Sequence, residues 1–233
     1  MQVAAAARDM KEKPVPPVSG KLLSEIAYER ILEGLFEKKV PAGAFVSQNE
    51  LVKLLDIPVA PLRDALRVLE AEGVLTIHPR SGIQFIKPDL ELTRATYQFR
   101  SIVERAAVRA YAEIAEETLV AATLKRHRKL IDLINADGFN AKAQAEMEKL
   151  EVVLHGGIIE ILKNPLIASS YRRMHNYLRL LRLDRKVTAP LALRTLHEHV
   201  EILTACERRD PDAAEAALVQ HFQAALQRNL GFF

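Results

Sequence analysis

The sequence predicts a mostly α-helical protein with two parts, an N-terminal winged helix-turn-helix and a following all-α bundle of about six helices. Apolar residues recur at helical spacing along most of the chain. Three short helical segments near the N-terminus precede a small β-hairpin. We expect a flexible leader over residues 1–20, because alanine, charged residues and proline are mixed there without apolar periodicity, then domains over 21–88 and 89–233.

The composition sets limits on location and function. With 49% hydrophobic and 27% charged residues, 233 residues suffice for two packed cores. The single cysteine, Cys206, forms no internal disulfide, which favours the reducing cytoplasm, and the absence of a long apolar run predicts no membrane span. A net charge of +3 is too small to indicate nucleic acid binding, so that prediction rests on how residues are arranged.

The first domain is predicted element by element. Apolar spacing from Lys21 to Lys38 predicts a helix, which Pro41 and Gly43 prevent from continuing, and VPAGAFV suits a short strand. Ser47 and Glu50 form a capping-box pattern, in which each side chain bonds the other's backbone N–H, and this begins a second helix of about two turns.

A third helix is predicted from about Val59 or Ala60 to Glu72, where Gly73 permits the chain to turn away. Two short β-runs follow, Val74 to Ile77 and Ile83 to Ile86, joined by a turn that contains Arg80. Three helices and then a hairpin is the element order of a winged helix-turn-helix.

Beyond Lys87-Pro-Asp89 the pattern is helical nearly to the end. Glycine or proline interrupts this helical pattern at four places, near Asp137-Gly138, Asn164-Pro165, Ala189-Pro190 and Asp210-Pro211. The predicted helices cover about 90–115, 117–136, 140–163, 165–185, 190–208 and 211–230. Helices with one apolar face and short connections predict an α-helical bundle.

Arginines mark a candidate DNA-reading surface. Arg63 and Arg67 lie one turn apart on the outward face of the third helix, and Arg80 lies at the hairpin tip. In a winged helix-turn-helix the corresponding helix enters the major groove, where arginine pairs with guanine or phosphate. The alternative is that all three are ordinary solvated arginines.

Residues 21–86 resemble the N-terminal domain of GntR-superfamily transcription regulators. The resemblance is carried by Pro41-Ala-Gly43 and by a gapless run from Glu50 to Gly73, in which Arg63 matches a key arginine of that family. It implies DNA binding, with the predicted contacts being Arg63, Arg67, Arg80, Asn49, Val59 and Ala60.

The chain departs from the family pattern where bases are usually read. Pro58-Val59-Ala60 replaces Ser-Arg-Thr at the start of the recognition helix, and the wing has Arg80-Ser81-Gly82 in place of Asn-Arg-Gly. Val59 and Ala60 are apolar and suit contact with thymine methyl groups. We therefore expect an operator rich in A·T at those positions.

Three histidines fall on apolar helix faces. His155 shares its face with Glu151 four residues earlier, and His199 and His221 each align with leucine or alanine. His197 lies about 200° round the helix from His199 and points outward. Each buried histidine is either hydrogen-bonded within the core or a metal ligand. Sequence alone does not decide between these readings.

Residues 90–228 resemble the effector-binding FCD domain of FadR-type GntR regulators. The matching residues are Glu151 to His155, Asn164-Pro165, Glu198-His199 and, in the last helix, His221, with glutamate in place of the usual aspartate at 151. The resemblance implies that Glu151, His155, His199 and His221 converge on one divalent metal. Such a donor set suits zinc, with nickel or manganese as alternatives.

The same resemblance implies a small carboxylate effector inside the bundle. Arg100 matches the arginine of the family's R-x-x-L-E signature and suits bidentate pairing with a carboxylate. The further candidates are Tyr97, Arg179, Arg172 and Arg182, each of which has an alternative reading as a surface or interhelix residue. His127 and His175 are predicted to be solvated or structural.

The predicted function is a dimeric, ligand-responsive transcription regulator. It would bind an operator with two-fold related half-sites and, in the preferred version, repress until the effector binds. Two alternatives stay open. A metal-dependent enzyme would use the same ligands, although the i, i+4 spacing of Glu151 and His155 differs from the Glu-x-x-His of di-metal bundles. The second alternative is a helical bundle that binds a partner and whose N-terminal module no longer reads DNA.

Overall fold

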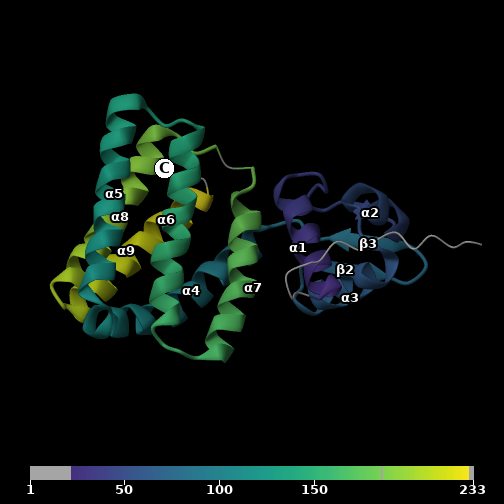
Figure 1. The fold of residues 1–233 in the computed structure, drawn as a ribbon, viewed down its shortest axis with the longest axis horizontal. Helices are drawn as coiled ribbons and strands as arrows, with labels where there is room; N and C mark the ends of the chain where they lie inside the picture. The colour runs from purple at the N-terminus through teal and green to yellow at the C-terminus, as the bar shows by residue number, and fades with distance from the viewer. Residues whose placement is uncertain (1–21, 185, 231–233) are drawn as a thin grey trace, which may run out of the picture.

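Helices make up most of the computed structural model, which describes residues 22–184 and 186–230 (Figure 1). The predicted leader over 1–20 lies outside the described residues. A winged helix-turn-helix comes first and a helical bundle follows, as the sequence predicts. In chain order the elements are α1 Leu23–Phe36, β1 Phe45–Val46, α2 Gln48–Leu55, α3 Val59–Ala71, β2 Leu75–His78, β3 Gly82–Phe85, α4 Leu90–Ile114, α5 Glu117–Asp137, α6 Ala141–Glu160, α7 Pro165–Arg182, α8 Ala189–Glu207 and α9 Pro211–Leu230.

The N-terminal domain packs three helices against a small antiparallel sheet. Strand β3 lies between β1 and β2, and His78 pairs with Gly82 next to the turn of the hairpin. The buried face of each helix supplies the core, which contains Ile31, Leu51 and Leu69. Alternation along β3 places Ile83 and Phe85 in that core and Gln84 outside it.

Local signals fix the helix-turn-helix. The predicted capping box is confirmed, because the Glu50 backbone N–H donates to Ser47 Oγ and the Ser47 N–H donates to the Glu50 carboxylate at 2.6 Å. Asp56 ends α2 with φ of 49°, in the left-handed region. Gly73, with φ of 76°, ends α3 in the same region, where glycine carries no Cβ penalty.

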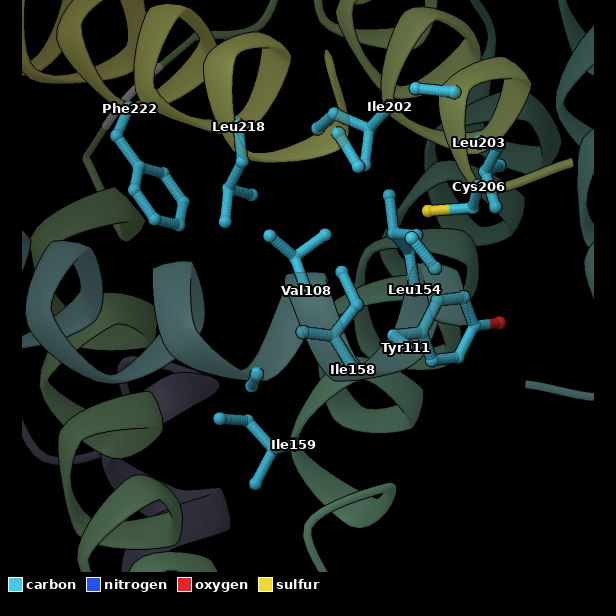
Figure 2. Close-up of a cluster of buried hydrophobic side chains, with 14 of the residues drawn as sticks. Val108, Tyr111, Leu154, Ile158, Ile159, Ile202, Leu203, Cys206, Leu218 and Phe222 are labelled. Atoms are coloured by element: carbon cyan, nitrogen blue, oxygen red, sulfur yellow. The ribbon is translucent and has the colours of Figure 1, made fainter. Parts of the chain in front are cut away.

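The second domain is a bundle of α4 to α9 around a large apolar core (Figure 2), with a second, smaller apolar cluster between α5, α6 and α8. Val108 on α4, Leu154 and Ile158 on α6, and Leu218 on α9 are all fully buried there. The Asn164 side chain caps α7 by accepting from the backbone N–H groups of Leu166 and Ile167. The core fixes the rotation of each helix and so determines which polar side chains face inward.

Helix α7 lies on the side of the bundle that faces the N-terminal domain (Figure 1). Its Leu180 is 3% exposed and packs into the core of that domain. Its Tyr177 hydroxyl donates to the Glu72 carbonyl oxygen, and Tyr28 donates to the Glu72 carboxylate at 2.8 Å. This helix therefore belongs to both cores. Within the described ranges, no helix is long and apolar enough to cross a membrane.

Candidate functional site

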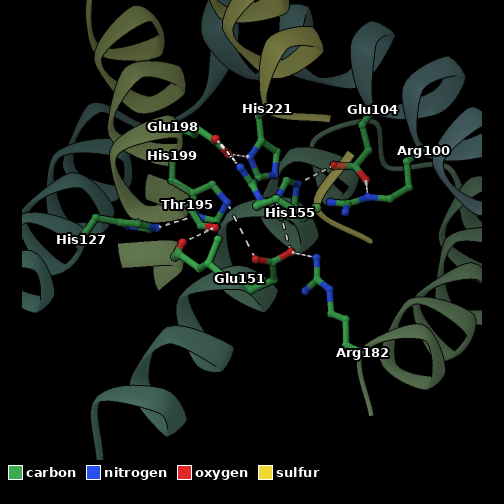
Figure 3. Close-up of polar contacts among 12 residues, drawn as sticks. Arg100, Glu104, His127, Glu151, His155, Arg182, Thr195, Glu198, His199 and His221 are labelled. Atoms are coloured by element: carbon green, nitrogen blue, oxygen red, sulfur yellow. Dashed lines mark hydrogen bonds and ion pairs between the residues drawn. The ribbon is translucent and has the colours of Figure 1, made fainter. Parts of the chain in front are cut away.

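Three histidines from three helices converge in the bundle (Figure 3). His155 on α6, His199 on α8 and His221 on α9 are each 1% exposed. One ring nitrogen from each lies within 4.8 Å of the others. The sequence predicts that each of these residues lies on the apolar face of its helix, and the structure shows that the three faces meet.

Carboxylates fix the orientation of two of these rings. His155 Nδ1 donates to Glu104 Oε2 at 2.6 Å, and His221 Nδ1 donates to Glu198 Oε2 at 2.8 Å. An ionised carboxylate only accepts, so in the neutral form of each imidazole the proton lies on Nδ1. The Nε2 lone pair of both residues is therefore available.

The third ring, that of His199, is oriented by a fourth histidine, His127, which is itself held by a backbone carbonyl group. His127 Nδ1 lies 2.8 Å from the Thr123 carbonyl oxygen, which only accepts, so that nitrogen carries the proton of His127. His127 Nε2 is then an acceptor, and His199 Nδ1 donates to it at 3.3 Å. His199 Nε2 is left with its lone pair, as in the other two residues.

The resulting donor set fits a divalent metal. The Nε2 atoms of His155, His199 and His221 are buried and have no hydrogen-bond partner within the described part of the chain. Burial lowers the pKa of His221 to about 4 and the pKa of His199 well below its usual value, so both stay neutral at pH 7. Buried lone pairs without partners are costly, and imidazole nitrogens are ligands that zinc prefers.

Glu151 lies beside the histidines but already has an ion-pair partner. Its Oε1 accepts from Arg182 at 2.8 Å, while its two oxygens lie 3.8 Å from the Nε2 atoms of His155 and His199. Burial opposes ionisation of Glu151, but Arg182 and the two histidines outweigh it and hold its pKa well below the usual range. A charged carboxylate thus lies within a short movement of the predicted metal position.

Two buried arginines hold the supporting carboxylates in place. Arg228 donates to both oxygens of Glu198, at 2.6 and 2.7 Å. Arg100, at 0% exposure, donates through Nε to Glu104 at 2.7 Å. Each arginine therefore acts on a histidine through a carboxylate. The sequence did not assign these supporting roles to Glu104, Glu198 or His127, although the i, i+4 spacing of Arg100 and Glu104 is a visible signal.

A cavity of about 380 Å³ adjoins the histidines. Glu151 and His221 line it together with Arg179 and Arg182, so the structure brings these predicted residues together. Arg100 and Tyr97 were predicted to bind the effector, but neither lines the cavity. The Tyr97 hydroxyl accepts from the Asn229 amide at 2.7 Å instead.

The remaining predicted histidines and Arg172 lie in distinct places. His197 is exposed, as predicted, and its Nδ1 bonds the Leu193 carbonyl oxygen. His127 is fully buried, which excludes the solvated alternative and leaves the structural one. His175 lines the cavity, and burial lowers its pKa to about 4. Arg172 is exposed and is not among the residues that line the cavity.

The arginines of the N-terminal domain share one concave surface. Arg63 and Arg67 on α3 and Arg80 in the β2–β3 turn line a groove of about 400 Å³, and all three are exposed. Arg63 Nε donates to Gln48 of α2 at 3.3 Å. The other predicted contacts, Asn49, Val59 and Ala60, are exposed near the starts of α2 and α3. A helix and a hairpin turn that present guanidinium groups together suit the DNA backbone and grooves.

Comparisons with known proteins agree with both parts of this fold. The FCD domain family matches residues 95–224, and bacterial regulatory proteins of the gntR family match residues 23–85. The chain therefore belongs to the GntR-family transcription regulators that carry an FCD domain. DNA binding and transcription regulation follow from that membership.

Three similar proteins illustrate the likeness. The HTH-type transcriptional regulator YcbG of Bacillus subtilis is 27% identical, over 92% of this chain and 93% of that protein. The HTH-type transcriptional repressor RspR of Escherichia coli is 24% identical, over 90% and 88%. The solved structure of E. coli McbR/YncC shares the fold with a TM-score of 0.72 at 15% identity, covering 91% of this chain and 98% of that one.

Proposed function

We propose that this regulator senses a small carboxylate effector at a metal site formed by Glu151, His155, His199 and His221. The observation that carries the proposal is the set of three buried Nε2 lone pairs, which have no partner within the described residues. Zinc fits best, because three imidazoles and one carboxylate are ligands it prefers, and nickel and manganese are the alternatives.

The surrounding residues prepare the site for an anion. Glu104, Glu198 and His127 hold the three imidazoles in the tautomer that presents Nε2. A divalent ion held there would supply an electrophile for a carboxylate oxygen. Arg179 and Arg182 line the adjoining cavity and add positive charge. Arg100 acts at a distance from this cavity, through its ion pair with Glu104.

We propose that two copies of the chain bind an operator with two-fold related half-sites. The position of α3 beside the hairpin supports entry of its N-terminal part into the major groove, with Arg63 and Arg67 on phosphate or base edges and Arg80 on the backbone. Effector binding would then lower the affinity for DNA, so that repression ends when the acid is present.

Fluorescence anisotropy with labelled DNA from upstream of the gene tests this function. The metal-loaded full-length chain should bind a fragment, and a panel of small carboxylic acids should contain members that release it. His199→Ala should still bind DNA but lose the response to the acid, whereas His197→Ala should keep both, because His197 is exposed and outside the cluster. Equal responses of the two variants would contradict the proposed sensing site.

A further inference from the structure

The cavity beside the histidines reaches the N-terminal domain. Most of its lining comes from the bundle, but Phe36, the last residue of α1, lines it too. His221 lines the same cavity, and Arg179, an exposed residue of α7, contacts Phe36 where the two domains meet. A ligand in this space would therefore touch the histidine cluster and the domain junction together.

The charged residues around the cavity are unevenly paired. Three arginines and two glutamates line it. Arg228 has both terminal nitrogens on Glu198, and Arg182 has one on Glu151. Arg179 makes no hydrogen bond or ion pair with any other described residue. Its guanidinium lies 3.5 Å from the centre of the Phe36 ring instead.

The hydrogen-bond donors that α7 contributes to the cavity lining favour an anion as the ligand of this cavity. Arg179 and Arg182 are three residues apart, so they lie on the same face of the helix. Arg182 Nε is buried and lacks a partner within the described ranges. Partial burial lowers the pKa of Arg179, and the attraction of Glu148 and Glu33 offsets that effect only in part. Guanidinium groups of this kind bind carboxylates with two parallel hydrogen bonds.

We propose that Arg179 and Arg182 form a second anion subsite and that the effector is a dicarboxylic acid. The inference rests on the proposed function, since the first carboxylate is the one bound at the histidine cluster. The second carboxylate lies on Arg179 and the unpaired Nε of Arg182, both of which belong to residues that line the cavity. A monocarboxylic acid of equal length leaves Arg179 without an anion and binds more weakly.

The subsite also connects the ligand to the DNA-binding domain. Arg179 contacts Phe36 of α1, and the adjacent Leu180 is buried in the core of that domain. An anion that draws the Arg179 guanidinium from the ring changes the contact between α7 and α1. Dicarboxylic acids therefore alter DNA affinity more than monocarboxylic acids at equal occupancy of the site.

Calorimetry with matched acids tests the proposal on the metal-loaded full-length chain. The probes are succinate, glutarate and adipate, each paired with the monocarboxylate of the same carbon number, butyrate, valerate and hexanoate. At least one diacid should bind about tenfold more tightly than its partner, the size expected for one charge-assisted pair. Arg179→Gln should remove that advantage, while Arg172→Gln, an exposed arginine of the same helix outside the cavity lining, should keep it.

The outcomes separate this inference from the proposed function. Equal affinity for diacids and monoacids, or equal behaviour of the Arg179→Gln and Arg172→Gln variants, would overturn the second subsite and leave carboxylate sensing intact. Binding of neither series to the metal-loaded protein would contradict carboxylate sensing and the second subsite together.

Discussion

Glu104 is the carboxylate on which two buried groups of the bundle depend. It accepts from Arg100 at 2.7 Å and from His155 at 2.6 Å, and the side chains of Arg100 and Glu104 are both 0% exposed. Burial favours the protonated form of Glu104, but Arg100 and His155 outweigh it and lower its pKa. Glu104→Gln therefore leaves the Arg100 charge buried without the carboxylate that it pairs with.

The expected cost follows from that loss of charge compensation. Removing one partner of a buried ion pair destabilises a protein by about 3–5 kcal/mol. Glu146→Gln is the matched control, because Glu146 pairs with Arg126 at a similar 2.8 Å but with side chains 36% and 44% exposed. An exposed pair of this kind contributes about 0–1 kcal/mol.

Urea denaturation followed by far-ultraviolet circular dichroism, in the presence of a chelator, measures both effects without a contribution from metal. The free energy of unfolding should fall by about 3–5 kcal/mol for Glu104→Gln and by less than about 1 kcal/mol for Glu146→Gln. Changes of equal size in the two variants would refute the reasoning that burial makes the Arg100–Glu104 pair indispensable.

Three further predictions concern other parts of the molecule. His127→Phe keeps a ring but removes the acceptor for His199 Nδ1, so zinc affinity measured by competition with a chelating dye should fall about 10–100-fold; an unchanged affinity would exclude this positioning role. Cys206 is 1% exposed, and burial raises its pKa to about 12. Ellman's reagent at pH 8 should therefore label Cys206 only after denaturation, and rapid labelling of the native chain would contradict this. Arg63→Ala should weaken operator binding by about 5–150-fold, equivalent to about 1–3 kcal/mol, whereas Arg94→Ala, exposed on α4, should not; anisotropy titrations that give equal losses would place the DNA elsewhere.

Much of the fold could be predicted because its signals are local. The Ser47–Glu50 capping box and the break at Asn164-Pro165 depend on residues a few positions apart, and the structure forms both as predicted. The winged order of elements follows from the same kind of signal. Apolar periodicity likewise determines which face of each helix is buried, and that placed His155, His199 and His221 in the interior.

The partners of the site residues depend on tertiary packing. Glu151 pairs with Arg182, 31 positions away on another helix, and only the rotation of α6 against α7 brings them together. Arg100 was predicted to face a ligand, yet the structure pairs it with Glu104 one turn along its own helix. The spacing allowed that pair, but spacing alone does not choose between an internal carboxylate and an external one.

His127 shows a different limit. Its helical neighbours Thr123, Leu124, Leu130 and Ile131 are buried, so periodicity could have predicted its burial. Its role depends on a chain of hydrogen bonds from the Thr123 carbonyl oxygen through His127 to His199. The tautomer of His199 is therefore set from another helix, which no local pattern reveals.

Metal stoichiometry tests the central claim most directly. The protein is purified without a histidine tag, loaded with zinc, dialysed and measured by elemental analysis alongside His199→Ala and His197→Ala. The converging Nε2 atoms predict one zinc per chain in the unmodified protein and in His197→Ala, and loss of zinc in His199→Ala. Absence of stoichiometric metal from the unmodified protein, or full retention in His199→Ala, would contradict the assignment of these histidines as a metal site.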